Sequence, residues 1–91
     1  MFRIAPDNTV SLVGKYATPN GIGISPDGRT LYHSDTQQGW IAHTLDASGR
    51  SVAERPFIDR AAQGMQGSGD GLRVDATGHV WMSGRDGISI I

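Results

Sequence analysis

The chain carries one sequence pattern twice, and this repeat constrains the fold more than any other feature. Residues 20–28 read NGIGISPDG and residues 70–78 read DGLRVDATG, so the two copies lie 50 residues apart, from 20 to 70. A fixed period of this size is typical of proteins built from repeated structural units. Each copy begins with a side chain that offers oxygen, an amide in Asn20 and a carboxylate in Asp70. We therefore expect these two side chains to occupy equivalent places in successive units.

Alternation of polar and apolar residues predicts β-strands. It runs through residues 9–13, 21–25, 30–34 and 79–83, and more loosely through residues 40–45 and 87–91. Turn-forming segments rich in Gly, Asp and Asn separate these stretches, because glycine accepts positive φ without strain. Short strands with turn signals every ~8–12 residues predict an all-β fold. The 13 glycines and the 37% apolar content suit tight turns and a thin core.

The repeat predicts that the whole chain, residues 1–91, is a single β-propeller fragment in three parts. Residues 20–63 are expected to form a full four-stranded blade, residues 70–91 an incomplete blade of three strands, and residues 1–19 the two-stranded tail of a preceding blade. At ~40–50 residues per blade, the chain holds about two blades of sequence. The predicted fold is thus a partial β-propeller of about two four-stranded antiparallel blades.

One glycine-rich stretch departs from this rhythm. Residues 59–69 hold three glycines and few apolar side chains. We interpret the stretch as a loop between two blades. A short helix over residues 58–63 is the alternative, although no apolar residue recurs there on one face.

Charge and composition exclude several classes of partner. The net charge is −1, from 8 Lys+Arg and 9 Asp+Glu, and these charges are scattered along the chain. Without a basic stripe, no nucleic-acid partner is predicted. The chain has no cysteine, which excludes disulfides and thiolate metal sites. No apolar run approaches the ~20 residues of a membrane span, and the N-terminus shows no signal region. We therefore predict no membrane partner, and the compartment stays open.

Two segments carry a family resemblance. Residues 18–36 read TPNGIGISPDGRTLYHSDT, and residues 69–81 read GDGLRVDATGHVW. Together they resemble the regucalcin/gluconolactonase/luciferin-regenerating enzyme family of six-bladed propeller lactonases, over nearly the whole chain. The first motif is fairly specific to that family, whereas the second is a general propeller pattern whose spacing from the first fits it. The resemblance implies a fragment of a metal-dependent, gluconolactonase-like hydrolase that opens a small-molecule lactone with water.

The resemblance also implies roles for the two oxygen-bearing residues. In that family the asparagine of a Pro-Asn-Gly motif and the aspartate of a later Asp-Gly motif hold a divalent cation, usually calcium. It therefore implies that Asn20 and Asp70 are metal ligands, and that Asp70 is also the catalytic base acting on water that the cation activates. Amide and carboxylate oxygens suit calcium, which normally takes ~6–8 oxygen ligands. Taken without the resemblance, both residues are interpreted as turn caps at the start of strands.

The sequence departs from the family pattern in three places. The family site also uses a glutamate and a further asparagine from earlier blades, whereas the only glutamate of this chain is Glu54. Residue 69 is glycine where many relatives have proline. The resemblance thus accounts for about half of the expected protein ligands.

The remaining candidate residues are interpreted as structural. The histidines show no metal-ligand spacing, so they are expected to be exposed or hydrogen-bonded strand residues: His33, His43 and His79. Ser34 and Ser83 repeat in frame, but the Gly-x-Ser-x-Gly elbow of many serine hydrolases is absent. Asp35 ends a predicted strand and could face the propeller tunnel. Tyr32 and Trp81 share one place in the repeat and are expected to pack between sheets.

A non-catalytic function is the alternative. The predicted blades leave exposed strand edges at both ends of the chain, and unpaired edges invite pairing with another chain. The chain would then be a propeller-derived binding or assembly module that closes its sheet edges by forming a homo-oligomer. Three copies of about two blades could rebuild a six-bladed ring.

Overall fold

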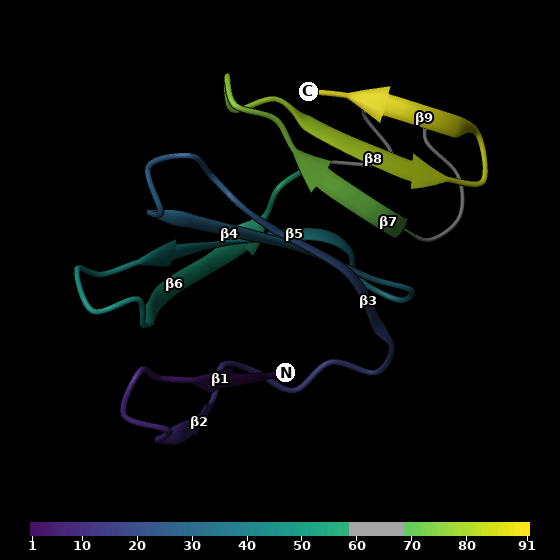
Figure 1. Cartoon of the computed structure of the whole chain (residues 1–91). Coiled ribbons are helices and arrows are strands. Elements are labelled where there is room, and N and C mark those ends of the chain that lie inside the picture. Colours follow the sequence, from purple (N-terminus) through teal and green to yellow (C-terminus); the bar gives the residue numbers. More distant parts are fainter. Residues whose placement is uncertain (59–68) are drawn as a thin grey trace.

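The computed structural model describes residues 1–58 and 69–91, and these residues form an all-β fold (Figure 1). They make antiparallel sheets of two, four and three strands, and within each sheet the strands follow their order in the sequence. We call them the N-terminal hairpin, the middle sheet and the last sheet, and Figure 1 shows them in succession. The predicted all-β fold of antiparallel, blade-like sheets is confirmed. No helix in the described part of the chain is long and apolar enough to cross a membrane.

Each of the six predicted stretches matches an observed strand to within a few residues, and three further strands, over residues 2–4, 51–56 and 69–74, lie where alternation had predicted no stretch. The N-terminal hairpin contains β1 (Phe2–Ile4) and β2 (Val10–Leu12); the middle sheet contains β3 (Pro19–Ile24), β4 (Thr30–Asp35), β5 (Gly39–Leu45) and β6 (Ser51–Pro56); the last sheet contains β7 (Gly69–Val74), β8 (Val80–Gly84) and β9 (Gly87–Ile90). The predicted loop over residues 59–69 and its helical alternative fall mainly on residues 59–68, which lie outside the described residues. The blade boundaries at residues 63 and 70 therefore stay a prediction.

The turns between paired strands repeat as well. Gly28 and Gly78 both have positive φ, at 72° and 91°, which glycine adopts without strain. Ahead of each glycine an aspartate caps the turn. Asp27 accepts a hydrogen bond from the backbone N–H of Arg29, and Asp75 accepts one from that of Thr77. These side-chain caps are the local reason that the chain reverses at the same place in both copies.

The apolar core lies between the middle and last sheets. Its buried members are Trp40, Ile58, Leu72, Val80 and Met82. Tyr32 packs against this cluster, so its predicted position between sheets is confirmed. The same prediction is wrong for Trp81, which is 44% exposed and donates its indole N–H to Asp75 Oδ2 at 3.0 Å. Successive strand residues face opposite sides, so Trp81 points away from the core formed by its neighbours, and no described sheet covers that face.

Candidate functional site

The two oxygen-bearing residues lie in equivalent irregularities of the first strands of their sheets. The pairing of β3 with β4 shifts register within residues 19–22, and that of β7 with β8 shifts within residues 69–72. In each case one extra residue is inserted into the first strand, which is a β-bulge. Asn20 and Asp70 lie inside these bulges, and both are exposed. Bulges re-aim side chains and are common beside active sites, so this placement suits a binding role.

The backbones of β3 and β7 touch next to both residues. A Cβ atom added to Gly21 would lie 2.6 Å from the carbonyl oxygen of Asp70 and 2.7 Å from the backbone nitrogen of Leu72. Only glycine permits such an approach, because any side chain would collide with backbone atoms that cannot rotate away. The structure therefore brings Asn20 and Asp70 onto neighbouring strands, each adjacent to the point of closest approach.

Ser34 joins the two bulges. Its side chain is fully buried, and its Oγ accepts a hydrogen bond from the backbone N–H of Gly21 at 2.8 Å. The same hydroxyl donates to the carbonyl oxygen of Asp70 at 2.6 Å. Sequence reasoning noted the repeated serine but assigned it no role. Its recurrence as Ser83 in the next copy of the repeat was the one available signal.

Asp35 supports the segment that leads into the first bulge. It is fully buried, and its carboxylate accepts hydrogen bonds from the backbone N–H groups of Thr18, Gln37 and Gln38 at 2.8 to 3.0 Å. Burial acts to raise the pKa of Asp35, but these three N–H donors outweigh it and hold the pKa below its ordinary value. The carboxylate oxygens of Asp35 are thus occupied by backbone N–H groups before β3 and in the turn after β4. That Asp35 faces the propeller tunnel stays a prediction.

A polar cluster that sequence reasoning missed lies on the other face of the middle sheet. His33 and His43 are both 1% exposed, and their Nε2 atoms lie 3.0 Å apart. The Tyr16 hydroxyl lies 3.1 Å from His43 Nε2 and donates to Glu54 Oε2 at 2.6 Å. His43 Nδ1 contacts Ser51 Oγ at 2.8 Å. The two histidines lie on successive predicted strands, residues 30–34 and 40–45, which was the available signal.

The environment of this cluster favours neutral histidines. Burial lowers the pKa of His33, and the neighbouring His43 lowers it further. Burial also lowers the pKa of His43. Among the described residues, His33 Nδ1 is buried without a hydrogen-bond partner. With both rings neutral, one Nε2 atom can donate to the other, whereas two protonated rings would set two N–H groups against each other. The prediction of hydrogen-bonded strand residues fits His33 and His43, whereas exposed His79 lies just before β8.

The donors at the paired bulges suit a hard divalent cation. An amide oxygen and a carboxylate are ligands that calcium prefers, and both side chains are exposed on neighbouring strands. In the parts of the chain that the structure describes, no three His, Cys, Asp or Glu side chains form a group that could hold a metal ion. Asn20 and Asp70 would therefore be two ligands of a set that calcium completes with further oxygen donors, water included.

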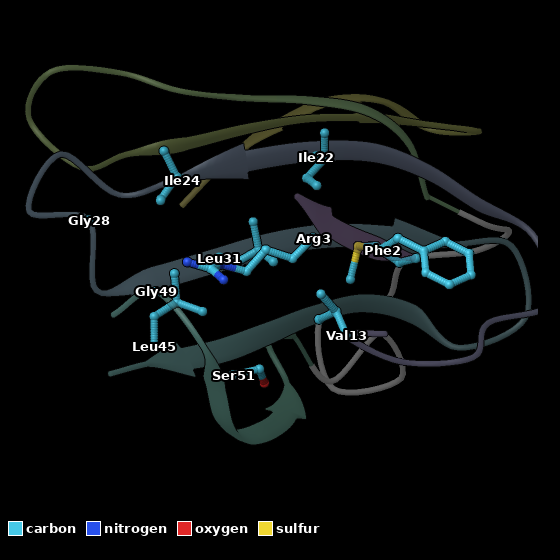
Figure 2. A pocket seen from close by; sticks show the side chains of 11 residues that line it. Phe2, Arg3, Val13, Ile22, Ile24, Gly28, Leu31, Leu45, Gly49 and Ser51 are labelled. Atoms are coloured by element: carbon cyan, nitrogen blue, oxygen red, sulfur yellow. The ribbon is translucent and has the colours of Figure 1, made fainter. Parts of the chain in front are cut away.

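An apolar groove separates the N-terminal hairpin from the middle sheet. Figure 2 shows side chains from β1, β3, β4 and β5 around it, and its volume is about 320 Å³. Its lining includes Phe2, Val13, Ile22, Ile24, Leu31 and Leu45. Neither Asn20 nor Asp70 is part of this lining. The groove therefore presents apolar surface, to which neither candidate ligand contributes.

Comparison with known proteins gives the same assignment as the motifs. Residues 1–91 match the SMP-30/gluconolactonase/LRE-like region. The chain is 30% identical over 99 aligned positions to a gluconolactonase of Zymomonas mobilis, an alignment that covers 99% of this chain and 28% of that protein.

Solved structures agree. A gluconolactonase from Xanthomonas campestris superposes with a TM-score of 0.81 at 29% identity, covering 99% of this chain and 30% of the other. The calcium-binding protein regucalcin from Agrobacterium tumefaciens superposes with a TM-score of 0.74 at 34% identity, covering 89% and 28% respectively. The chain thus spans roughly 30% of the length of these relatives, and its fold is a partial propeller. It belongs to the SMP-30/gluconolactonase/LRE-like family.

Proposed function

We propose that the paired bulges belong to the active site of a lactonase-type hydrolase that opens a small-molecule lactone with water. The observation that carries the proposal is the equivalent position of Asn20 and Asp70 in bulges of two touching strands. Relatives named as gluconolactonases support this reaction class. Since the chain spans about 30% of such a relative, the activity is proposed for the complete site to which these residues contribute.

The proposed cofactor is a divalent cation, with calcium as the first choice. Asn20 and Asp70 would hold it through their side-chain oxygens, in line with the preference of calcium for such ligands. A calcium-binding relative supports the choice of metal. When bound, the cation would polarise the lactone carbonyl and stabilise the negative charge that develops on its oxygen.

Asp70 is proposed as the base. Its carboxylate would accept a proton from water as the water oxygen bonds to the carbonyl carbon of the lactone. The bond between this carbon and the ring oxygen then breaks, and the ring oxygen takes up a proton, which leaves a hydroxy acid. Asn20 cannot take this proton, because its amide does not ionise near neutral pH. Asn20 would thus hold the cation, whereas Asp70 would both hold the cation and accept the proton.

Replacing Asp70 by asparagine tests the proposal. Asp70→Asn keeps the shape and one oxygen but loses the charge and the base, so we expect weaker calcium binding and a fall in the rate of lactone opening of at least about 100-fold. Calorimetry would measure the first and acid release from glucono-δ-lactone the second. Asp27→Asn, which changes a turn carboxylate outside the paired bulges, is the control and should retain both properties. Unchanged calcium-dependent hydrolysis in Asp70→Asn would reject the assignment.

A second candidate is a non-catalytic binding or assembly module that forms a homo-oligomer through its exposed strands. Exposed apolar side chains on the hairpin and the last sheet favour it, among them Phe2, Ile4, Ile88 and Ile90. Covering these side chains would remove apolar surface from water. Sedimentation separates the two candidates, because a mass that stays at 9.7 kDa at high concentration would contradict the module.

A further inference from the structure

The Ser34 hydroxyl accepts one hydrogen bond within the middle sheet and donates another to the last sheet. A bulge removes a residue from the regular ladder, and here the backbone N–H of Gly21 is taken up by Ser34 Oγ at 2.8 Å. The hydroxyl proton then goes to the carbonyl oxygen of Asp70 on β7 at 2.6 Å. One buried side-chain oxygen thus joins the bulge of β3 to the bulge of β7.

Ser34 forms hydrogen bonds with the two peptide groups that come directly after the two candidate ligands in the chain. The N–H of Gly21 belongs to the peptide bond that Asn20 makes with Gly21, and the carbonyl oxygen of Asp70 belongs to the peptide bond that follows Asp70. Fixing these two peptide groups restricts the backbone on which both side chains are carried. We propose that Ser34 is a positioning residue, which sets the separation and orientation of Asn20 and Asp70 for one shared cation. This role rests on the function proposed above.

The space around Ser34 is filled in a way that preserves this link. A Cβ atom added to Gly69 would lie 2.8 Å from Ser34 Cβ and 2.8 Å from the indole of Trp40. Glycine at residue 69 therefore lets β7 sit directly against the serine.

Ser83 provides the matched comparison within the molecule. It stands opposite the bulge of β7 as Ser34 stands opposite that of β3. Its hydroxyl donates to the carbonyl oxygen of Gly71 in its own sheet at 3.3 Å, a longer contact that joins no second sheet. The repeat therefore supplies a serine at each bulge, but within the described residues only Ser34 connects two candidate ligands.

Calcium titration of the protein tests the role. Groups that orient metal ligands typically change affinity by about 10- to 100-fold when they are removed. We expect Ser34→Ala to weaken calcium binding about 10-fold by calorimetry, whereas Ser83→Ala should stay within about twofold of the wild type. Val80→Ala is the control for stability, because it removes buried apolar contact in the core and leaves the serine link intact. All titrations are made at a temperature at which each variant is folded.

The outcomes separate this role from the proposed function. If Ser34→Ala binds calcium as tightly as the wild type, the positioning role is overturned and the metal site stands. The same conclusion follows if Val80→Ala loses as much calcium affinity as Ser34→Ala. No calcium binding by the wild type would overturn both. If Ser34→Ala does not fold, amide hydrogen exchange of the wild type decides: calcium should slow exchange at Gly21 more than at Gly71, and equal effects would overturn the role.

Discussion

The same positions of the repeat meet two different environments at the two contacts between sheets. In the last sheet, Leu72 is 3% exposed and Met82 is 1% exposed, and both belong to the apolar core that lies against the middle sheet. The equivalent positions on the face toward the N-terminal hairpin are Ile22, which is 52% exposed, and His33, which is buried in the polar cluster. One contact between neighbouring sheets is thus closed and apolar, whereas the other is part open groove and part polar cluster.

This difference shows that a repeat position does not have a fixed burial. The alternation of the strand decides which face a side chain takes, and the neighbouring sheet decides whether that face is covered. The hairpin leaves the groove of Figure 2 against β3 and β4, whereas β7 approaches β3 so closely that Gly21 has no room for a side chain. The apolar contact should therefore dominate stability, and the polar one should make stability depend on pH.

The largest expected effect comes from truncating the closed contact. Leu72→Ala deletes buried methyl groups from the core and should lower the free energy of unfolding by about 3 kcal/mol. Ile22→Ala is the matched control in the other copy of the repeat, and its half-exposed side chain should cost about 1 kcal/mol or less. Urea unfolding measures both. Equal losses would show that the hairpin side is packed as firmly as the core.

An intermediate effect is expected where the backbones meet. Gly21→Ala places a Cβ atom 2.6 Å from the Asp70 carbonyl oxygen and should cost about 2 kcal/mol, because the strands must separate. Gly71→Ala is the equivalent change in the next copy, where the added atom meets only Ser83 Oγ at 3.5 Å. That variant should be close to neutral in the same unfolding measurement. A neutral Gly21→Ala would mean that β3 and β7 are not in close contact.

The smallest effect concerns pH. Burial lowers the pKa of His33 and of His43, so the unfolded chain binds more protons than the folded one below about pH 6.5. Stability should be complete above that pH and fall as the pH drops below it. Glu54, Tyr16 and Asp35 are the other titratable groups near the pair. Melting temperatures between pH 8 and pH 5 measure the fall, above the range in which Asp35 titrates.

Two variants sharpen this prediction. His33→Met installs the residue that the repeat places at the equivalent position in the last sheet, and it should flatten the dependence on pH between 8 and 5. His79→Gln changes the exposed histidine and should leave the wild-type dependence intact. A His33→Met protein that loses stability on acidification as steeply as the wild type would assign the effect to other groups.

Much of the fold followed from local pattern. Polar and apolar alternation located six of the nine described strands. Turn segments rich in Gly, Asp and Asn were predicted between the strands, and the turn at Gly28 with its Asp27 cap is one of them. Tyr32 was predicted to pack between sheets and does so, but Trp81 in the same frame does not. The two positions are equivalent in sequence, so no local rule could separate them. What separates them is the presence of a covering sheet on one side only.

For the candidate site, the repeat predicted Asn20 and Asp70 as equivalent oxygen donors, because each is the first residue of its copy of the repeat. It did not reveal that Ser34 links the peptide groups beside them, or that His33 and His43 share a buried contact with Tyr16. These contacts join residues far apart in the chain, and they depend on how closely the sheets approach.

The sequence by itself determined the strand order, the turns, the family and the pair of candidate ligands. Each of these depends on the spacing of residues close together in the chain or on the repeat. Only the tertiary structure decided which faces are closed, which serine spans two sheets and which histidines meet. The physical reason is that alternation and turn chemistry act over a few residues. The packing of one sheet on another depends instead on glycine positions, bulges and side-chain volumes from both partners at once.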